Sequence, residues 1–391
     1  MSSSEKHLLD RAAFEKLKRI LPQRSAALRD AAHEGGATRA LPDELAFKLT
    51  NRCNLRCTHC YQWNAEGHHR DLTPEEQRRD LPFAILQKVL EATRGVRSNL
   101  YFWGGEPLLY ADWDRLVDLL AADPRWTTVC TNGLGIEARM ESLLRISEQL
   151  EIYVAIDGDE ASHDALRGFG SYDRALKGLR ELRRAKSRGE FRGEISVNFV
   201  ITEAAIPKLA SIVELWEAEG IDVLYFSLPW HISPGAAAEM SSYCATHLPW
   251  VLRQTAGRRP SWQAYTHQMR PELAGDLVEA LARARASARK LKLRYNPEVA
   301  PEDLPEFLSG SSKPAGGKSR CLSLKSRLDV FPSGEVVSCK FFPEFVVGQL
   351  AEQSLEEIWS GAAFRDVRET VDRCGLMPVC AHCNLLYSRG V

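Results

Sequence analysis

Eight of the ten cysteines in this 391-residue chain fall into two groups. Cys53, Cys57 and Cys60 are separated by three and then two residues, so one tight loop can bring three thiolates to a single metal centre. Three thiolates are one fewer than the four that a closed zinc or iron–sulfur site takes. Such a centre keeps one metal position open for an exogenous group, and an open position indicates chemistry.

The second group occupies the end of the chain and comprises Cys321, Cys339, Cys374, Cys380 and Cys383. Residues 328–339 are typical of a β-hairpin that turns at Pro332 to Gly334, so Cys321 and Cys339 can meet at its base. Cys380 and Cys383 have the spacing Cys-x2-Cys and add two more thiolates. By residue type alone, four thiolates in two pairs suit a structural zinc ion as well as an iron–sulfur cluster.

The rest of the composition excludes several classes of function. Lys and Arg total 51 against 52 Asp and Glu, so no global positive field is available to attract a nucleic acid. The N-terminus lacks a signal-peptide pattern, and no apolar run of about 18 residues predicts a membrane span. We therefore expect a cytoplasmic protein, in which reduced, clustered cysteines more often bind metal than form disulfides.

The sequence around the first cysteine group consists of short apolar runs separated by helical stretches, and these predicted strands and helices position the three cysteines. Candidate strands lie at 45–49, 100–103, 127–130, 152–156, 195–201 and 223–228, and candidate helices at 84–93, 111–120, 139–150, 172–185 and 206–218. This alternation favours a parallel sheet or partial barrel, with ligands at the carboxyl ends of the strands. We divide the chain into a helical lead-in (1–43), a core (44–230), a helical, aromatic-rich bridging region (231–320) and a cysteine-rich tail (321–391).

Two motifs on this frame carry a family resemblance. The Cys-x3-Cys-x2-Cys loop after the first strand, with Gly104-Gly105-Glu106-Pro107 after the second, resembles the radical SAM superfamily from Phe47 to Trp230. The resemblance implies a partial (β/α)6 TIM-like barrel. In that family three cysteines hold a 4Fe–4S cluster whose fourth iron is chelated by S-adenosylmethionine, and here Cys53, Cys57 and Cys60 take this role.

The same resemblance implies contacts to S-adenosylmethionine at the strand ends. Glu106 accepts hydrogen bonds from its ammonium group, Arg167 pairs with its carboxylate, and Asn198 bonds its ribose or is simply a polar residue that lines the barrel. Either His59 or Tyr61 packs near the adenine, and Ala155 replaces a serine found in many relatives. The other implied contacts are Gly104 and Gly105, which would let the backbone approach the ligand closely, together with Pro107, Thr131, Asn132 and Asp157.

The tail resembles the SPASM and twitch extensions of radical SAM enzymes, a β-hairpin plus helix domain that binds auxiliary iron–sulfur clusters. The resemblance rests on Cys321, twelve residues, Gly334, four residues and Cys339, with Gly348 and 355–359 at the usual spacing. Seven cysteines hold two clusters in a full SPASM domain, and five are present. We therefore expect one auxiliary 4Fe–4S cluster on Cys321, Cys339, Cys380 and Cys383, with Cys374 a spare or alternative ligand and structural zinc the competing interpretation.

The resemblance also implies an activity. The family cleaves S-adenosylmethionine to a 5'-deoxyadenosyl radical, and an auxiliary cluster favours an oxidative outcome such as a cross-link or a dehydrogenation. We expect a peptide substrate in natural-product (RiPP) maturation, an electron donor such as flavodoxin or ferredoxin, and, because 1–43 is short, a separate leader-peptide recognition protein. The alternatives are a dehydrogenase or epimerase acting on an aminocyclitol or sugar, and a zinc-stabilised binding module.

Several residues stay without an assigned part in this chemistry. No catalytic acid, base or hydrogen donor can be named from the sequence. The aromatic stretch 250–295 is typical either of a peptide groove or of a helical lid with ordinary core aromatics. Cys130 lies on an apparent core strand, which indicates a packed thiol, while the sequence leaves Cys244 ambiguous.

Overall fold

The computed structural model describes residues 40–255 and 257–391 and scattered helical positions near the N-terminus, namely Phe14, Lys18, Leu21, Pro22, Ser25, Ala26, Leu28 and Arg29. The rest of the predicted lead-in 1–43 lies outside the described residues. None of the described helices has both the length and the apolar composition that crossing a membrane requires.

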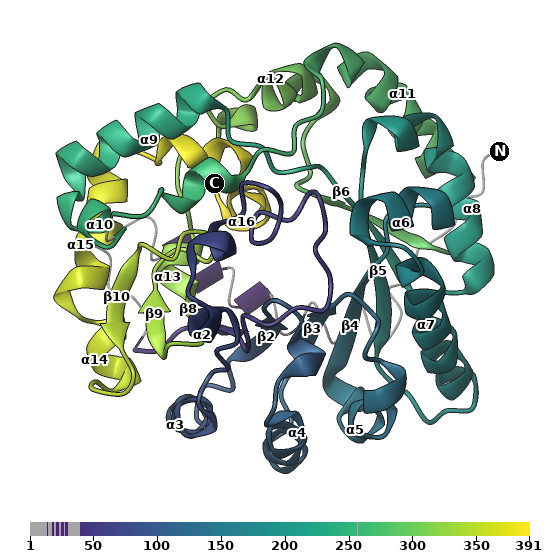
Figure 1. Ribbon diagram of the computed structural model, residues 1–391, viewed down its shortest axis with the longest axis horizontal. Helices are drawn as coiled ribbons and strands as arrows, with labels where there is room; N and C mark the ends of the chain where they lie inside the picture. Colours follow the sequence, from purple (N-terminus) through teal and green to yellow (C-terminus); the bar gives the residue numbers. More distant parts are fainter. Residues whose placement is uncertain are drawn as a thin grey trace.

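One ten-stranded sheet forms the frame, in the order β10-β9-β8-β1-β2-β3-β4-β5-β6-β7. Its strands are β1 Glu44–Lys48, β2 Asn99–Trp103, β3 Thr127–Thr131, β4 Leu150–Ala155, β5 Glu194–Val200, β6 Val223–Ser227, β7 Lys292–Asn296, β8 Arg327–Val330, β9 Glu335–Val337 and β10 Val346–Gln349. Neighbours from β8 through β7 pair in parallel, and β8, β9 and β10 form an antiparallel meander. The sheet curves as an open barrel (Figure 1).

Helices cover the outer face of this sheet. Figure 1 shows α3, α4, α5, α7 and α8 around the outside of the arc, on the segments where the hydrophobic pattern predicts helices. Their bounds are α3 Phe83–Ala92, α4 Trp113–Ala122, α5 Met140–Arg145, α7 Ser171–Ser187 and α8 Leu209–Glu219. The chain leaves the predicted helix 139–150 early, because α5 ends at Arg145 and the last residue of that range opens β4.

The remaining helices lie in the loops, in the bridging region and in the tail. They are α2 Pro74–Gln77, α6 Glu160–Arg167, α9 Pro234–His247, α10 Pro249–Arg253, α11 Ala274–Ser287, α12 Leu304–Ser309, α13 Ser323–Ser326, α14 Leu355–Trp359, α15 Ala362–Cys374 and α16 Asn384–Arg389. Short 3-10 turns join them. Cys244, which the sequence left ambiguous, is fully buried in α9 and belongs to the hydrophobic core.

Side-chain alternation along the strands separates an apolar outer face from a polar inner face. On β4, Ile152 and Val154 are fully buried in the core, whereas Glu151 and Tyr153 line an interior cavity. On β3, Val129 points to the core and Cys130 lines the cavity. Cys130 is half-buried and packs against a small inner apolar cluster of Ala46, Trp103, Phe331 and Val337, as expected for a packed thiol, and it also lines the cavity.

The sheet extends beyond the six predicted strands at both edges. The bridging region contributes β7, which pairs in parallel with β6, and the tail contributes β8, which pairs in parallel with β1. The Glu44 carboxylate of β1 accepts hydrogen bonds from Arg327 of β8 and Arg389 of α16. Burial alone would raise the pKa of Glu44, but these two guanidinium groups hold it at about 2. The tail is thus built onto the barrel, and the predicted boundaries at 230 and 320 stay predictions.

Candidate metal centres and the cavity between them

The first cysteine group lies in the loop that leaves β1 at the carboxyl edge of the sheet. This loop is anchored by Arg52, whose guanidinium bonds the Asp80 carboxylate at 2.5 and 3.0 Å, and by the Thr58 amide, which donates to the Leu166 carbonyl at 2.8 Å. Cys57 is buried, and Cys53 and Cys60 are half-buried. Burial raises the pKa of Cys53 to about 12 and of Cys57 to about 11, and the charges of the three thiolates interact. A bound metal deprotonates such thiols, so this donor set fits a metal cluster.

Gly104 and Gly105 bring the loop after β2 against the cysteine loop. A Cβ on Gly104 would lie 2.6 Å from the Thr50 carbonyl oxygen, and one on Gly105 would lie 2.1 Å from that of Arg52. Both contacts are shorter than side chains tolerate. The sequence predicted that these glycines let the backbone approach the ligand closely. In the structure, their backbone packs closely against the loop that carries the cysteines.

The Glu106 carboxylate is almost fully buried and already holds three hydrogen bonds. Its Oε1 accepts from the Thr131 hydroxyl at 2.7 Å and the Leu108 amide at 3.1 Å, and its Oε2 accepts from the Asn132 amide at 2.7 Å. Burial raises the pKa of Glu106 to about 6, against the lowering effect of these donors. The Asn132 side chain also donates to Asn54 in the cysteine loop at 2.8 Å. Thr131 and Asn132 therefore fix Glu106 and the cysteine loop together.

Arg167 connects the fourth strand to the first cysteine group. Its Nε donates to the Asp157 carboxylate at 2.6 Å, and its Nη1 lies 4.0 Å from the Cys57 sulfur. Asp157 is fully buried behind it and accepts from the Val200 amide at 2.9 Å, while its own amide donates to His163 at 3.1 Å. Burial would raise the pKa of Asp157, but Arg167 and His59 keep it below its usual value. Arg167 is thus held in place by a carboxylate of this chain.

Four of the thiols in the tail converge although the chain separates them widely. The charges of Cys321, Cys339, Cys380 and Cys383 interact with one another, and burial raises the pKa of each thiol, for Cys383 to about 12. Cys374 is not among them. It ends α15, where its sulfur lies 3.6 Å from Nδ1 of His247 on α9. Four converging thiols are the number that one cluster takes.

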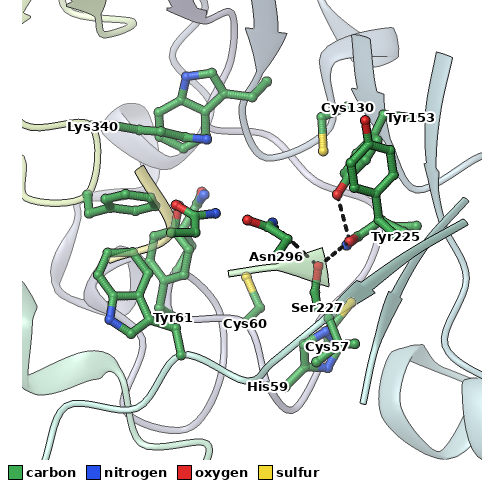
Figure 2. A pocket seen from close by; sticks show the side chains of 18 of the residues that line it. Cys57, His59, Cys60, Tyr61, Cys130, Tyr153, Tyr225, Ser227, Asn296 and Lys340 are labelled. Atoms are coloured by element: carbon green, nitrogen blue, oxygen red, sulfur yellow. Dashed lines mark hydrogen bonds between the residues drawn. The ribbon is translucent and has the colours of Figure 1, made fainter. Parts of the chain in front are cut away.

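One cavity of about 590 Å³ is lined by the first thiol group and by residues adjacent to the second. Cys53, Cys57 and Cys60 line one part of it, as Figure 2 shows for Cys57 and Cys60. The tail lines another part of the cavity. Its residues there include Lys340 and Phe341, which follow Cys339, and His382 and Asn384, which flank Cys383. The complete list of tail residues in the lining is Arg327, Lys340, Phe341, His382, Asn384, Leu385, Ser388 and Arg389. A molecule in this cavity therefore lies between the two groups.

Nine of the eleven predicted cofactor contacts line this cavity: His59, Tyr61, Gly104, Gly105, Glu106, Thr131, Asn132, Arg167 and Asn198. Pro107 starts a buried 3-10 turn, and Asp157 lies behind Arg167. Tyr61 stacks on Tyr265 with ring centroids 4.6 Å apart, and His59 lies 3.6 Å from the Asp157 carboxylate. Asn198 accepts from the Tyr153 hydroxyl at 2.8 Å and the Ser227 hydroxyl at 2.5 Å.

Sequence reasoning missed most of the inner wall. Lys340, Tyr101 and Tyr153 line the cavity, and Lys340 is held over the Tyr101 ring at 4.4 Å and the Trp103 ring at 5.0 Å. Tyr265 and Trp230 also line it, but Trp250 and Trp262 of the aromatic stretch do not. The alternation of side chains along each strand could have identified these lining residues, but only once it is known which face of the strand points to the interior.

Comparison with known proteins agrees with this geometry. Residues 47–202 match the radical SAM superfamily, and residues 321–384 match the SPASM family, an iron–sulfur cluster-binding domain. The chain belongs to the radical SAM superfamily. Both matched segments contain the cysteines described above, so the protein uses S-adenosylmethionine and 4Fe–4S clusters.

Similar proteins differ in their named products. The radical SAM protein is 27% identical to the pre-heme d1 synthase of Dinoroseobacter shibae over 86% of this chain and 78% of that one. It is 24% identical to the mycofactocin maturase MftC of Mycobacterium tuberculosis, over 86% and 75%. SuiB of Streptococcus suis, solved bound to S-adenosylmethionine, shares the fold, with a TM-score of 0.58 and 14% identity over 93% of this chain and 74% of that one.

A substitution at Glu106 separates its structural contribution from cofactor binding. In Glu106→Gln, an amide NH2 replaces one acceptor oxygen and faces a backbone N–H, so we expect the free energy of unfolding to fall by about 1–3 kcal/mol per unpaired donor. We also expect weaker S-adenosylmethionine binding, since the charge is lost. Thermal unfolding of the cluster-free protein and calorimetric titration of the reconstituted protein measure the two effects.

Thr131→Val is the matched control for Glu106→Gln, because it keeps the carboxylate and removes one of its donors, together with the hydroxyl that accepts from the Gly133 amide at 3.1 Å. It should also lower stability, but it should leave the charge available to the cofactor. A Glu106→Gln protein with unchanged S-adenosylmethionine affinity would show that this carboxylate only holds the loops together.

Proposed function

We propose that this radical SAM protein oxidatively modifies an unactivated carbon of a peptide, by cross-linking or dehydrogenation, in the maturation of a ribosomal natural product. The observation that carries the proposal is the single cavity lined by residues next to both thiol groups. A carbon placed there is within reach of chemistry at the first group. The electron that an oxidation releases can pass to the second group through the tail residues that line the cavity, such as Lys340 and Phe341 beside Cys339.

We infer the following roles for the chain's own residues. Cys53, Cys57 and Cys60 hold the first cluster, and Cys321, Cys339, Cys380 and Cys383 hold the one auxiliary cluster. When bound, the first cluster and S-adenosylmethionine supply a 5'-deoxyadenosyl radical that abstracts a hydrogen atom. The inner wall excludes water and orients the substrate, and the hydrogen-bonded set Tyr153, Asn198 and Ser227 offers it a fixed polar surface.

The wall of the cavity indicates which substrates fit. Tyr61, Tyr265, Trp230 and Phe341 form an aromatic cluster in which the Trp230 and Phe341 ring centroids lie 3.9 Å apart. Such a surface suits a peptide side chain. The similarity to mycofactocin maturases favours the same class. We place this chemistry in the cytoplasm, with flavodoxin or ferredoxin as electron donor.

A second candidate is a small molecule that carries carboxylates. Lys340 faces the cavity and makes no ion pair with any residue in the described part of the chain, so a substrate anion can pair with it. The similarity to pre-heme d1 synthase over most of both chains supports this candidate. An aminocyclitol, the alternative expected from the sequence, would place an amine against this ammonium group and fits less well.

The substrate class can be tested before the substrate is known. The reconstituted protein is incubated anaerobically with S-adenosylmethionine, dithionite and a low-molecular-mass extract of its host, and 5'-deoxyadenosine is quantified. We expect the extract to raise 5'-deoxyadenosine formation above the rate without substrate, and prior digestion of the extract with a broad protease to remove this increase. An increase that survives digestion would contradict a peptide substrate and favour the second candidate.

A further inference from the structure

The outer side of the first cysteine loop carries a surface that the proposed chemistry leaves unused. A groove of about 410 Å³ separates loop residues 54–58 from the turn that joins α6 to α7. The Thr58 amide bonds the Leu166 carbonyl and ties its two walls together. The groove lining consists of Asn54, Leu55, Arg56, Thr58, Leu134, Asp164, Ala165, Leu166, Arg167, Gly168, Phe169, Ser171 and Arg174.

Phe169 stands at the edge of this groove with its side chain fully in solvent. Its relative exposure is 101%, against 53% for Leu21, the next most exposed of the large hydrophobic residues described. The flanking Gly168 and Gly170 have φ angles of 123° and 72°, a region that favours glycine. Asp164 fixes this turn by accepting from the Gly170 amide at 2.6 Å. A held turn that presents an aromatic ring to water is typical of a contact surface.

The groove also presents positive charge. Arg56 and Arg174 are both exposed, and within the described residues neither forms an ion pair. Asp164 is the one carboxylate in the lining, and it is occupied by the Gly170 and Tyr172 amides and the Ser171 hydroxyl. Arg167 is neutralised by Asp157. Arg56 and Arg174 therefore line the groove without a carboxylate partner in the part of the chain that the structure describes, and the Arg56 guanidinium is held over the Trp63 ring, 3.9 Å from its centroid, and by the Cys53 and Leu55 carbonyls.

The floor of the groove touches the first cysteine group. Arg167 lines both the groove and the interior cavity, and its guanidinium lies 4.0 Å from the sulfur of Cys57. Leu55, which sits between Cys53 and Cys57 in the sequence, lines both as well. A protein seated in the groove is therefore separated from the first group by little more than these two side chains.

We propose that this groove is the docking surface for an acidic one-electron donor protein. The aromatic ring supplies apolar contact, and Arg56 and Arg174 attract the donor's carboxylates. In each transfer the reduced donor loses one electron and the oxidised first cluster gains it, with no bond made or broken. The inference rests on the first cluster held by Cys53, Cys57 and Cys60, and it does not depend on the identity of the substrate.

The double variant Phe169→Ser with Arg174→Glu tests this surface. With reduced flavodoxin as the probe and no substrate, we expect 5'-deoxyadenosine formation to fall by about tenfold or more, because one contact is lost and one charge is reversed. With dithionite, which needs no docking surface, the rate should match that of the wild type. The flavodoxin-driven rate of the wild type should also decline as salt is raised, while the variant should respond less.

Arg253→Glu is the matched control, since it reverses an exposed charge on α10, on the opposite side of the molecule from α7 (Figure 1). It should leave both rates unchanged. Two results would overturn the proposal: an unchanged flavodoxin-driven rate in the double variant, as expected if the groove binds a leader peptide instead, or an equal loss with both reductants. Because no substrate is present, the outcome is independent of the proposed peptide modification.

Discussion

The variant Cys53→Ala, Cys57→Ala, Cys60→Ala is expected to form no detectable 5'-deoxyadenosine and to lose about half of the iron bound by the wild type. These thiols are the inferred ligands of the first cluster, and the loop offers no replacement donor of the same kind. The barrel should persist, because Arg52 bonds Asp80 and the Thr58 amide bonds Leu166 without help from any cysteine. Anaerobic iron analysis measures the expected loss of iron, and a chromatographic assay measures the expected absence of 5'-deoxyadenosine.

Cys130→Ala is the matched control for this variant. Its sulfur lines the same cavity on β3 but belongs to neither group (Figure 2). It should keep the full iron content and form 5'-deoxyadenosine. Substantial 5'-deoxyadenosine from the triple variant would mean that cleavage of S-adenosylmethionine does not depend on this loop.

The variant Cys380→Ala, Cys383→Ala is expected to keep the first cluster and the cleavage of S-adenosylmethionine, while forming no modified product. It removes two of the four converging thiols in the tail. The two groups come from separate loops, so the first should assemble without the second. No modified product should form, because the electron released when the substrate is oxidised then has no acceptor near the cavity. Product and 5'-deoxyadenosine are measured on one sample, with the substrate supplied by the host extract.

Cys374→Ala gives this experiment a control within the same domain. The Cys374 sulfur contacts His247 on α9 and is not grouped with the other four, so its loss should leave iron content and product unchanged. Loss of ligands can also loosen the tail, since metal binding is coupled to folding, and circular dichroism of each variant is therefore needed. Wild-type product yield from a folded protein that lacks the second cluster would contradict a catalytic role for that cluster.

The fold was largely predictable because strong local patterns match the tertiary contacts. Alternating apolar runs and helical stretches predicted six parallel strands, and all six occur in that order in the sheet. β7 was not predicted, because its Lys292 and Arg294 interrupt the hydrophobic pattern and the strand lies at an exposed edge. The parallel pairing of β8 with β1 joins residues more than 280 positions apart, and no local pattern encodes it.

The candidate site was predictable where residue spacing carries chemistry. The two cysteine groups follow from spacing, whereas the assignment of Cys374 as a spare or alternative ligand follows from the SPASM resemblance and stays a prediction; in space its sulfur contacts His247. The pairing of Arg167 with Asp157 could not be foreseen, because it depends on how α6 packs beside β4. The inward direction of Cys130 likewise depends on which face of β3 meets the helices.

The central claim is that the tail holds an iron–sulfur cluster facing the same cavity as the first. Iron, sulfide and zinc analysis of the anaerobically purified wild type, beside Cys380→Ala, Cys383→Ala, tests it most directly. We predict about eight iron atoms per wild-type chain, about four in the variant, and no stoichiometric zinc in either. About four iron atoms and one zinc ion per wild-type chain, with only the zinc lost in the variant, would contradict the claim.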